Sequence, residues 1–347
     1  MGGPIPIRLE GAAPVDQRGR ALRDLRISVL DRCNFRCPYC MPEEHYPRDH
    51  EFLSKRERLR FEEIERLARV FAGLGVRKLR LTGGEPLLRR ELPELVRRLA
   101  AIPGIDDVAL TTNGSLLAAQ ARALREAGLS RITLSLDALD PDTFRSLSGG
   151  RGDVASVLAA IDAAEAAGFG PLKINCVVMR GRNDHQVLDL LAHFRGSGHV
   201  VRFIEYMDVG TCNDWRGGLV VPGAELRARI DARWPLRPLA PNHAGEVARR
   251  YAFADGAGEV GFIDSVSAPF CGDCTRARLS ADGRLYTCLF AANGHDLRGP
   301  VRAGIDDVEL ARLIRAAWNA RDDRYSELRG ATVGAAREHV EMYAIGG

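Results

Sequence analysis

The sequence lacks any apolar run that approaches the roughly 18 residues a helix needs to cross a membrane. Its first residues, MGGPIPIRLE, lack the charged segment followed by an apolar segment that marks a secretory signal. They also lack the myristoylation pattern, because Pro6 stands where that pattern requires serine or threonine. We therefore expect neither a membrane protein nor an exported one, and we predict a cytoplasmic location.

Lysine is scarce, since only Lys55, Lys78 and Lys173 occur among 49 basic residues. Where nearly every cation is arginine, a lysine can mark a place that needs a compact ammonium group. The net charge of +3 is too small to predict general nucleic-acid binding. The length of 347 residues, with 46% hydrophobic residues, fits one large α/β domain with or without a smaller appendage.

Short apolar segments alternate with amphipathic segments from residue 25 to residue 207. Six segments are typical of buried strands: 25–30, 78–82, 108–112, 132–137, 172–179 and 200–207. Helical spacing predicts helices over 61–74, 92–102, 116–127, 154–167 and 187–194. This order implies a parallel sheet with right-handed crossovers, and periodicity alone allows an open doubly wound sheet or a partial (β/α) barrel.

After about residue 208 this alternation ends, and only one further long helix is predicted, over 308–320. We therefore expect three parts. An N-terminal arm would cover 1–22, a barrel 23–210, and a C-terminal region 211–347, which ends in Gly346-Gly347. In the barrel part, glycine and polar residues gather where predicted strands end, and sites form at that edge in both architectures.

Cysteine is clustered, which indicates metal or cluster ligation rather than disulfides in a chain without an export signal. Six of the eight cysteines form two groups of three: Cys33, Cys37 and Cys40, and Cys271, Cys274 and Cys288. Cys176 fits a buried strand position, and Cys212 has no role that the sequence explains. Buried apolar thiols and structural zinc remain the alternatives for the two groups.

The first group, CNFRCPYC, follows the first predicted strand. Three thiolates can hold three irons of a cubane cluster and leave the fourth iron open for another ligand. Zinc with His45 or His50 as a fourth ligand is the alternative, although structural zinc sites favour paired C-x2-C motifs. After the next strand comes Gly-Gly-Glu-Pro at 83–86, where glycines permit close backbone approach and Glu85 can orient neighbouring groups.

These two motifs together resemble the radical S-adenosylmethionine (SAM) superfamily. In that superfamily SAM chelates the open iron, and its reductive cleavage gives a 5′-deoxyadenosyl radical. The Gly-Gly-Glu-Pro turn of the superfamily meets the amino group of SAM.

The second group has the spacing C-x2-C-x13-C and encloses Arg276 and Arg278. These arginines are two apart in a predicted strand, so they point the same way and suit an anionic substrate. A second [4Fe–4S] cluster with an open iron is the favoured interpretation, and zinc with His295 is the alternative.

With both groups, the chain resembles the molybdenum cofactor biosynthesis protein A family, the GTP 3′,8-cyclases. The resemblance extends from about Arg26 to Gly347. It rests on CNFRCPYC, LRLTGGEP, TTNG, SLDAL, the second cysteine group with its RAR, and the terminal Gly-Gly.

The resemblance implies a role for each motif residue. Ligands of two [4Fe–4S] clusters would be Cys33, Cys37 and Cys40, and Cys271, Cys274 and Cys288. Contacts to SAM would come from Tyr39, Gly83, Gly84, Glu85, Ser135 and Met207. Contacts to GTP would come from Arg26, Arg80, Thr111, Lys173, Arg276 and Arg278. Gly346 and Gly347 would reach into the active site and assist catalysis together with Arg276 and Arg278.

The resemblance also implies a lyase with an α/β fold, an incomplete (β/α)6 TIM-type barrel with a C-terminal cluster-binding extension. It would cyclise GTP to 3′,8-cyclo-7,8-dihydroguanosine 5′-triphosphate, the first step of molybdopterin synthesis. The radical would take the ribose C3′ hydrogen, and C3′ would then add to guanine C8.

Expected partners are an electron donor such as flavodoxin or ferredoxin, the downstream cyclic pyranopterin monophosphate synthase, and a second copy of the chain. The alternatives are a radical SAM enzyme acting on a peptide and a non-catalytic zinc or electron-transfer protein.

Overall fold

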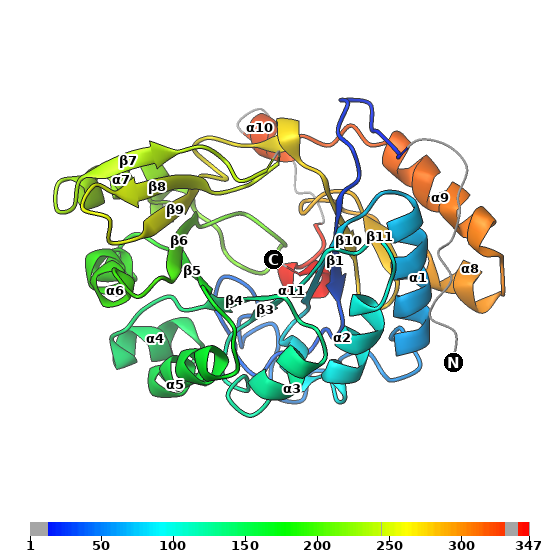
Figure 1. Ribbon diagram of the computed structural model, residues 1–347, viewed down its shortest axis with the longest axis horizontal. Coiled ribbons are helices and arrows are strands. Elements are labelled where there is room, and N and C mark those ends of the chain that lie inside the picture. Colours follow the sequence, from blue (N-terminus) through cyan, green and yellow to red (C-terminus); the bar gives the residue numbers. More distant parts are fainter. Residues whose placement is uncertain (1–12, 244, 330–338, 347) are drawn as a thin grey trace.

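The computed structural model describes residues 13–243, 245–329 and 339–346, and one sheet of twelve strands organises them (Figure 1). The strand order is β12-β11-β10-β1-β2-β3-β4-β5-β6-β9-β8-β7. The first six strands are β1 (Asp24–Ser28), β2 (Lys78–Thr82), β3 (Asp107–Thr112), β4 (Arg131–Ser135), β5 (Lys173–Val178) and β6 (Val200–Glu205). They pair in parallel and in chain order, which confirms the six predicted strands.

Helices connect these strands on the outer face of the sheet. They are α1 (Phe61–Gly73), α2 (Leu92–Ala100), α3 (Ala121–Glu126), α4 (Pro141–Leu147), α5 (Val154–Ala166) and α6 (Val187–Phe194). The helix predicted over 116–127 begins only at Ala121, because turns that start with a bond from the Leu117 amide to the Gly114 carbonyl precede it. Helix α4 was not predicted, although Asp140 caps it and Pro141 opens its first turn.

The C-terminal region lengthens the sheet at both ends. Strand β9 (Glu259–Ile263) pairs in parallel with β6, and β10 (Arg276–Leu279) pairs in parallel with β1. Antiparallel strands follow on each side: β8 (Arg249–Phe253) and β7 (Leu236–Leu239), and β11 (Arg284–Tyr286) and β12 (His295–Asp296). The last helix, α11 (Met342–Ile345), lies near the centre of the molecule and contacts β1 (Figure 1).

The remaining helices lie in the C-terminal region. They are α7 (Gly223–Asp231), α8 (Arg298–Arg302), α9 (Asp307–Asn319) and α10 (Tyr325–Leu328). The predicted helix over 308–320 is confirmed as α9. None of the helices in the described ranges combines the length and the apolar character that a membrane span requires.

The N-terminal arm is packed from residue 13 onward, whereas its glycine- and proline-rich composition suggested a loose segment. Val15 and Ala21 form a β-bridge, and Leu22 is buried in the core. The side chains of Asp16 and Arg20 are 0% and 2% exposed and form an ion pair at 2.6 Å. Long-range ionic contacts that composition does not reveal therefore hold this segment in place.

Candidate functional site

The first cysteine group lies on the loop that follows β1, and Arg36 organises this loop. The Arg36 guanidinium is almost fully buried and donates to the carbonyls of Cys33 at 2.8 Å and Phe35 at 2.9 Å. It also donates to the Tyr46 carbonyl at 2.7 Å, further along the chain. The Arg36 side chain thus joins the two ends of the loop by hydrogen bonds and holds the backbone that carries the thiols.

The Gly83-Gly84 turn after β2 packs directly against this cysteine loop. The amide of Gly84 donates to the Leu30 carbonyl at 2.7 Å, and the amide of Glu85 donates to the Arg32 carbonyl at 2.9 Å. A Cβ atom would lie 2.2 Å from the Leu30 oxygen at Gly83 and 2.3 Å from the Arg32 oxygen at Gly84. Only glycine permits this approach, as the sequence analysis predicted.

Glu85 is buried, and its carboxylate links this turn to the end of β3. It accepts hydrogen bonds from the Thr112 hydroxyl at 2.8 Å, the Asn113 amide at 2.8 Å and the Leu87 amide at 3.0 Å. Burial raises its pKa to about 7 despite these bonds. The predicted orienting role of Glu85 is therefore visible, and its contact with SAM stays a prediction.

A small pocket beside this loop is lined by Tyr39 and Ser135, two of the residues predicted to contact SAM, and by Cys37, a predicted ligand of the first cluster. Two further lining residues, Asn113 and Asp137, were not predicted. Asp137 accepts a hydrogen bond of 2.5 Å from the Tyr39 hydroxyl. The Asn113 side-chain nitrogen lies 3.9 Å from the Cys33 sulfur. Asn113 follows β3 and Asp137 follows β4, and this position after a predicted strand is the sequence feature that could have identified both as site residues.

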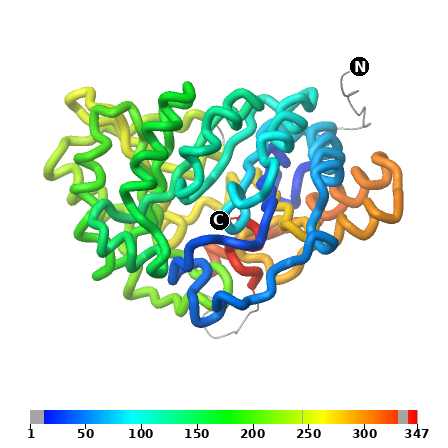
Figure 2. Tube along the Cα trace, turned by 90° about the horizontal axis from the view of Figure 1, so that it is seen from below, coloured from blue at the N-terminus to red at the C-terminus, as the bar shows by residue number. Residues whose placement is uncertain are grey.

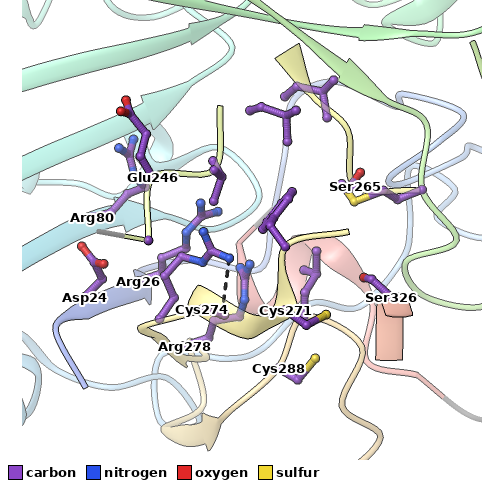
Figure 3. Close-up of a pocket in the computed structure, with 18 of the residues that line it drawn as sticks. Asp24, Arg26, Arg80, Glu246, Ser265, Cys271, Cys274, Arg278, Cys288 and Ser326 are labelled. Carbon is purple, nitrogen blue, oxygen red and sulfur yellow. Dashed lines mark hydrogen bonds between the residues drawn. The ribbon is translucent and has the colours of Figure 1, made fainter. Parts of the chain in front are cut away.

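A larger cavity brings together all the residues predicted to contact GTP. These residues are Arg26, Arg80, Thr111, Lys173, Arg276 and Arg278. Figure 3 labels Arg26, Arg80 and Arg278 among the residues that line the cavity. The same cavity is lined by the three cysteines of the second group, Cys271, Cys274 and Cys288. Met207, predicted to contact SAM, also lies here rather than in the small pocket.

A row of arginines crosses the cavity floor. Strand register places Arg26 of β1 between Arg80 of β2 and Arg278 of β10. Burial, followed by repulsion from neighbouring arginines, lowers the pKa of Arg80 and of Arg278 to about 10, and that of Arg26 well below its ordinary value. The protein holds these cations close together, which favours a polyanionic ligand.

Further cations line the same cavity. Burial and nearby arginines lower the pKa of Lys173 and of Lys78 to about 8, and that of Arg202 to about 9. Lys78 and Arg202 were not predicted as site residues. Both belong to strands in which every second side chain faces the cavity. The alternation of charged and apolar residues in KLRLT and VVRFIE is the sequence feature that could have identified them as site residues.

The second cysteine group lies at the opposite side of the cavity from Arg80, near Arg278 (Figure 3). The Arg276 guanidinium donates to the Cys274 sulfur at 3.3 Å. Burial would raise the pKa of Cys274, but the charges of Arg276 and Arg321 outweigh it and lower the pKa to about 6. Cys274 is thereby prepared as a thiolate, the form that ligates iron.

Buried charges anchor the loop of the second group to the N-terminal arm. Arg20 donates to the carbonyls of Cys271 and Asp323, both at 2.7 Å. Arg321 donates to the Cys274 carbonyl at 2.7 Å and to Asp16 at 3.1 Å. The N-terminal arm is therefore part of the second cysteine site.

Replacing Arg20 with glutamine is expected to lower the free energy of unfolding by about 3 kcal/mol, since it leaves Asp16 buried with one partner fewer. It is also expected to lower bound iron from about eight to about four atoms per chain, as loss of one of two four-iron clusters would do. Denaturant unfolding and iron analysis measure both effects. Arg145→Gln, which removes a surface ion pair with Asp142, is the control. A variant with full iron content would contradict the anchoring role of Arg20.

Gly346, near the C-terminus, contacts residues of β2 and β10, the two strands that flank β1 in the sheet. Arg278 donates hydrogen bonds to the carbonyl of Gly346 and, at 3.4 Å, to that of Ile345. A Cβ atom at Gly346 would lie 2.0 Å from the Thr82 methyl carbon. Gly346 thus contacts Arg278, which lines the cavity. The reach of the tail into the active site stays a prediction, and Gly347 lies outside the described residues.

The chemistry of the thiols fits two iron–sulfur clusters. All eight cysteines are free, and the six of the two groups lie on loops beside the two pockets. Burial raises the pKa of Cys33 to about 12, so a positive metal centre would be needed to favour its thiolate. In the described part of the chain, no three His, Cys, Asp or Glu side chains are grouped as ligands of a single metal ion.

Comparison with known proteins identifies the family. Residues 27–194 match the Radical SAM superfamily, and residues 199–327 match Molybdenum Cofactor Synthesis C. A GTP 3′,8-cyclase of Xanthomonas campestris pv. campestris (strain B100) is 62% identical, with 97% of this chain and 98% of the relative covered. That of Staphylococcus aureus (strain MRSA252) is 46% identical, with 96% and 98% covered. The chain belongs to the GTP 3′,8-cyclase family.

Membership in the GTP 3′,8-cyclase family confirms the predicted resemblance, the prediction of an enzyme, and the predicted cofactors, SAM and iron–sulfur clusters. The fold is confirmed separately by a solved structure, that of Streptococcus suis SuiB bound to S-adenosylmethionine. It superposes with a TM-score of 0.62 at 14% identity over 91% of this chain and 69% of SuiB. Both comparisons agree with the incomplete TIM-type barrel.

Proposed function

We propose that this member of the GTP 3′,8-cyclase family converts GTP to 3′,8-cyclo-7,8-dihydroguanosine 5′-triphosphate, the first step of molybdenum cofactor biosynthesis. The observation that supports this most directly is the larger cavity. It combines the second cysteine group with a set of cations, namely Arg26, Lys78, Arg80, Lys173, Arg202, Arg276 and Arg278. The negative charges of a triphosphate would be neutralised by these cations. The guanine base would bind the open iron of the cluster that the second cysteine group holds.

The two cysteine groups would hold the two cofactor clusters at different pockets. Cys33, Cys37 and Cys40 would bind the cluster that serves SAM, and Tyr39 and Ser135 would line the SAM pocket beside it. Bound there, the cluster and SAM supply a 5′-deoxyadenosyl radical that can remove a hydrogen atom from a ribose carbon.

The cavity residues would bind and orient the nucleotide. Arg26, Arg80 and Arg278 form one row across three neighbouring strands, so their guanidinium groups can contact successive phosphates. Burial, and then repulsion from neighbouring arginines, lowers their pKa values, and a bound polyanion offsets that repulsion, which favours binding. The Arg80 guanidinium is already held by the hydroxyls of Thr111 at 2.9 Å and Thr133 at 3.1 Å.

The C-terminal segment would help to enclose the reaction. Gly346 lies against Thr82 and Arg278, and Ile345 is fully buried. Exclusion of water protects a carbon radical from side reactions. Arg278 has a double role in this proposal, since it contacts both the tail and the phosphate-binding row.

The test is a survey of substrates. The protein is reconstituted anaerobically, reduced, and incubated with SAM and, separately, with GTP, ATP, CTP, UTP or a peptide. We expect a cyclised nucleotide and 5′-deoxyadenosine with GTP only. Formation of 5′-deoxyadenosine with a peptide, but none above background with GTP, would support the peptide-modifying alternative and refute the cyclase.

We propose the remaining associations on chemical grounds. Reduction of the first cluster calls for a one-electron donor such as flavodoxin or ferredoxin. The product would pass to a cyclic pyranopterin monophosphate synthase, and the enzyme would work as a homodimer. Free cysteines in cluster-binding arrangements suit the reducing conditions of the cytoplasm.

A further inference from the structure

The C-terminal segment 339–346 contacts three loops before it reaches Arg278, which lines the larger cavity. Next to the second cysteine group, Nδ1 of His339 lies 2.8 Å from the Phe290 carbonyl, and the Val340 amide donates to the Ala291 carbonyl at 3.1 Å. Beside the first group, the ring of Tyr343 packs edge-on against Tyr46 at 5.0 Å. In Figure 2 this segment, in red, lies next to the dark blue loop of the first group.

The third loop follows β6 and holds the side chain of Glu341. One carboxylate oxygen accepts hydrogen bonds from the Thr211 amide and from the Thr211 hydroxyl, both at 2.8 Å. The other oxygen lies 3.0 Å from the Cys212 sulfur, where the thiol can donate. Within the described ranges, Glu341 forms no ion pair, so these neutral donors are what hold it.

The loop is shaped to admit this carboxylate. Gly210 has a φ of +79°, and a Cβ atom there would lie 2.1 Å from an oxygen of Glu341. We call Gly210, Thr211 and Cys212 the glutamate cradle. It gives Cys212, which the sequence left unexplained, a specific contact with a residue 129 positions away.

Glu341 is also the residue at which helix α11 begins. Its φ and ψ of −65° and 144° are extended, and the next four residues, Met342–Ile345, are helical. Four helical residues rise only about 6 Å along the helix axis, so Gly346 lies a short distance from Glu341. A fixed Glu341 at the start of α11 therefore determines where the helix ends, and so where Gly346 meets Thr82 and Arg278.

We propose that Glu341, held in the glutamate cradle, is the positioning residue that sets where Gly346 meets Thr82 and Arg278 at the edge of the active site. This inference rests on the proposed function, because it assigns Glu341 a part in GTP cyclisation. Glu341 acts through the tail and does not contact the substrate. Its effect should therefore depend on the tail being present.

The test compares Glu341→Ala with Glu341→Gln in the reconstituted full-length enzyme. Alanine removes the anchor, and displacement of the tail by about 1 Å is expected to lower cyclisation by roughly 100-fold. Glutamine retains an acceptor oxygen for Thr211 and is expected to keep most of the activity. Iron content and SAM cleavage without GTP should equal those of the wild type in both variants.

The decisive readout is non-additivity. Removal of Gly346-Gly347 and Glu341→Ala should each lower cyclisation, and the combined variant should be no slower than the truncation alone. Losses that multiply would overturn the proposal, and so would wild-type cyclisation by Glu341→Ala or a loss of iron in that variant. A wild-type enzyme without GTP turnover would refute the proposed function instead.

Two glycine variants control for backbone strain. Gly210→Ala fills the cradle, whereas Gly256→Ala has a similar φ of +82° and no atom within 4 Å of the new Cβ. Only Gly210→Ala should reproduce the loss of cyclisation. Glu126→Ala, on the exposed side of α3, controls for removal of a glutamate. Equal losses in the two glycine variants would overturn the role of the cradle.

Discussion

Replacement of Cys288 with alanine is expected to abolish conversion of GTP while leaving the SAM site intact. Cys288 lies on the loop after β11, and its sulfur accepts a hydrogen bond from the Phe290 amide at 3.4 Å. Without it, only Cys271 and Cys274 remain to hold a cluster in the larger cavity, and two thiolates do not retain a cubane. Iron analysis should show about four atoms per chain instead of about eight.

SAM binding by Cys288→Ala should match the wild type, because the first cysteine group lies on a separate loop after β1. The control is Cys176→Ala. Cys176 is 1% exposed in β5 and belongs to the hydrophobic core, so its loss should cost only about 1 kcal/mol of stability. A Cys288→Ala enzyme that still cyclises GTP would contradict the assignment of the second group.

Replacement of Gly346 with alanine is expected to slow cyclisation by roughly 100-fold with both clusters retained, since the tail can no longer reach its position. The new Cβ would lie 2.0 Å from the Thr82 methyl carbon, on a backbone with a φ of +71°. The chain must retreat from Thr82, and the hydrogen bond from Arg278 to the Gly346 carbonyl is lost. Product formation under single-turnover conditions measures the effect.

The control for Gly346→Ala is Gly181→Ala. Gly181 has a φ of +69°, but no atom lies within 4 Å of the position its Cβ would occupy. It therefore carries the same backbone cost of about 1 kcal/mol without the clash. Normal cyclisation by Gly346→Ala would remove the tail from the mechanism, and equal slowing by both variants would attribute the effect to backbone strain alone.

Features that depend on short stretches of sequence were predictable. The strands β1 to β6 are buried on the helix-covered face, so their apolar periodicity marks them directly. The cysteine groups, the Gly83-Gly84 turn and the Arg276–Arg278 pair are each contained in a few consecutive residues. Their chemistry could therefore be inferred before their neighbours were known.

Features that depend on distant contacts were not predictable. The packed N-terminal arm depends on Arg20, which reaches Cys271 some 251 positions away. The anchoring of Glu341 by Thr211 and Cys212 joins residues about 130 positions apart in sequence. None of these pairs leaves a pattern in one sequence, because the fold alone brings them together.

The origin of the hydrogen atom that the enzyme removes tests the central claim most directly. GTP deuterated at ribose C3′ is incubated with the reduced, reconstituted enzyme and SAM, and the 5′-deoxyadenosine is analysed by mass spectrometry. If the larger cavity holds GTP with its ribose facing the SAM pocket, the 5′-deoxyadenosine should carry the deuterium. Cyclised product accompanied by 5′-deoxyadenosine without deuterium would contradict the account.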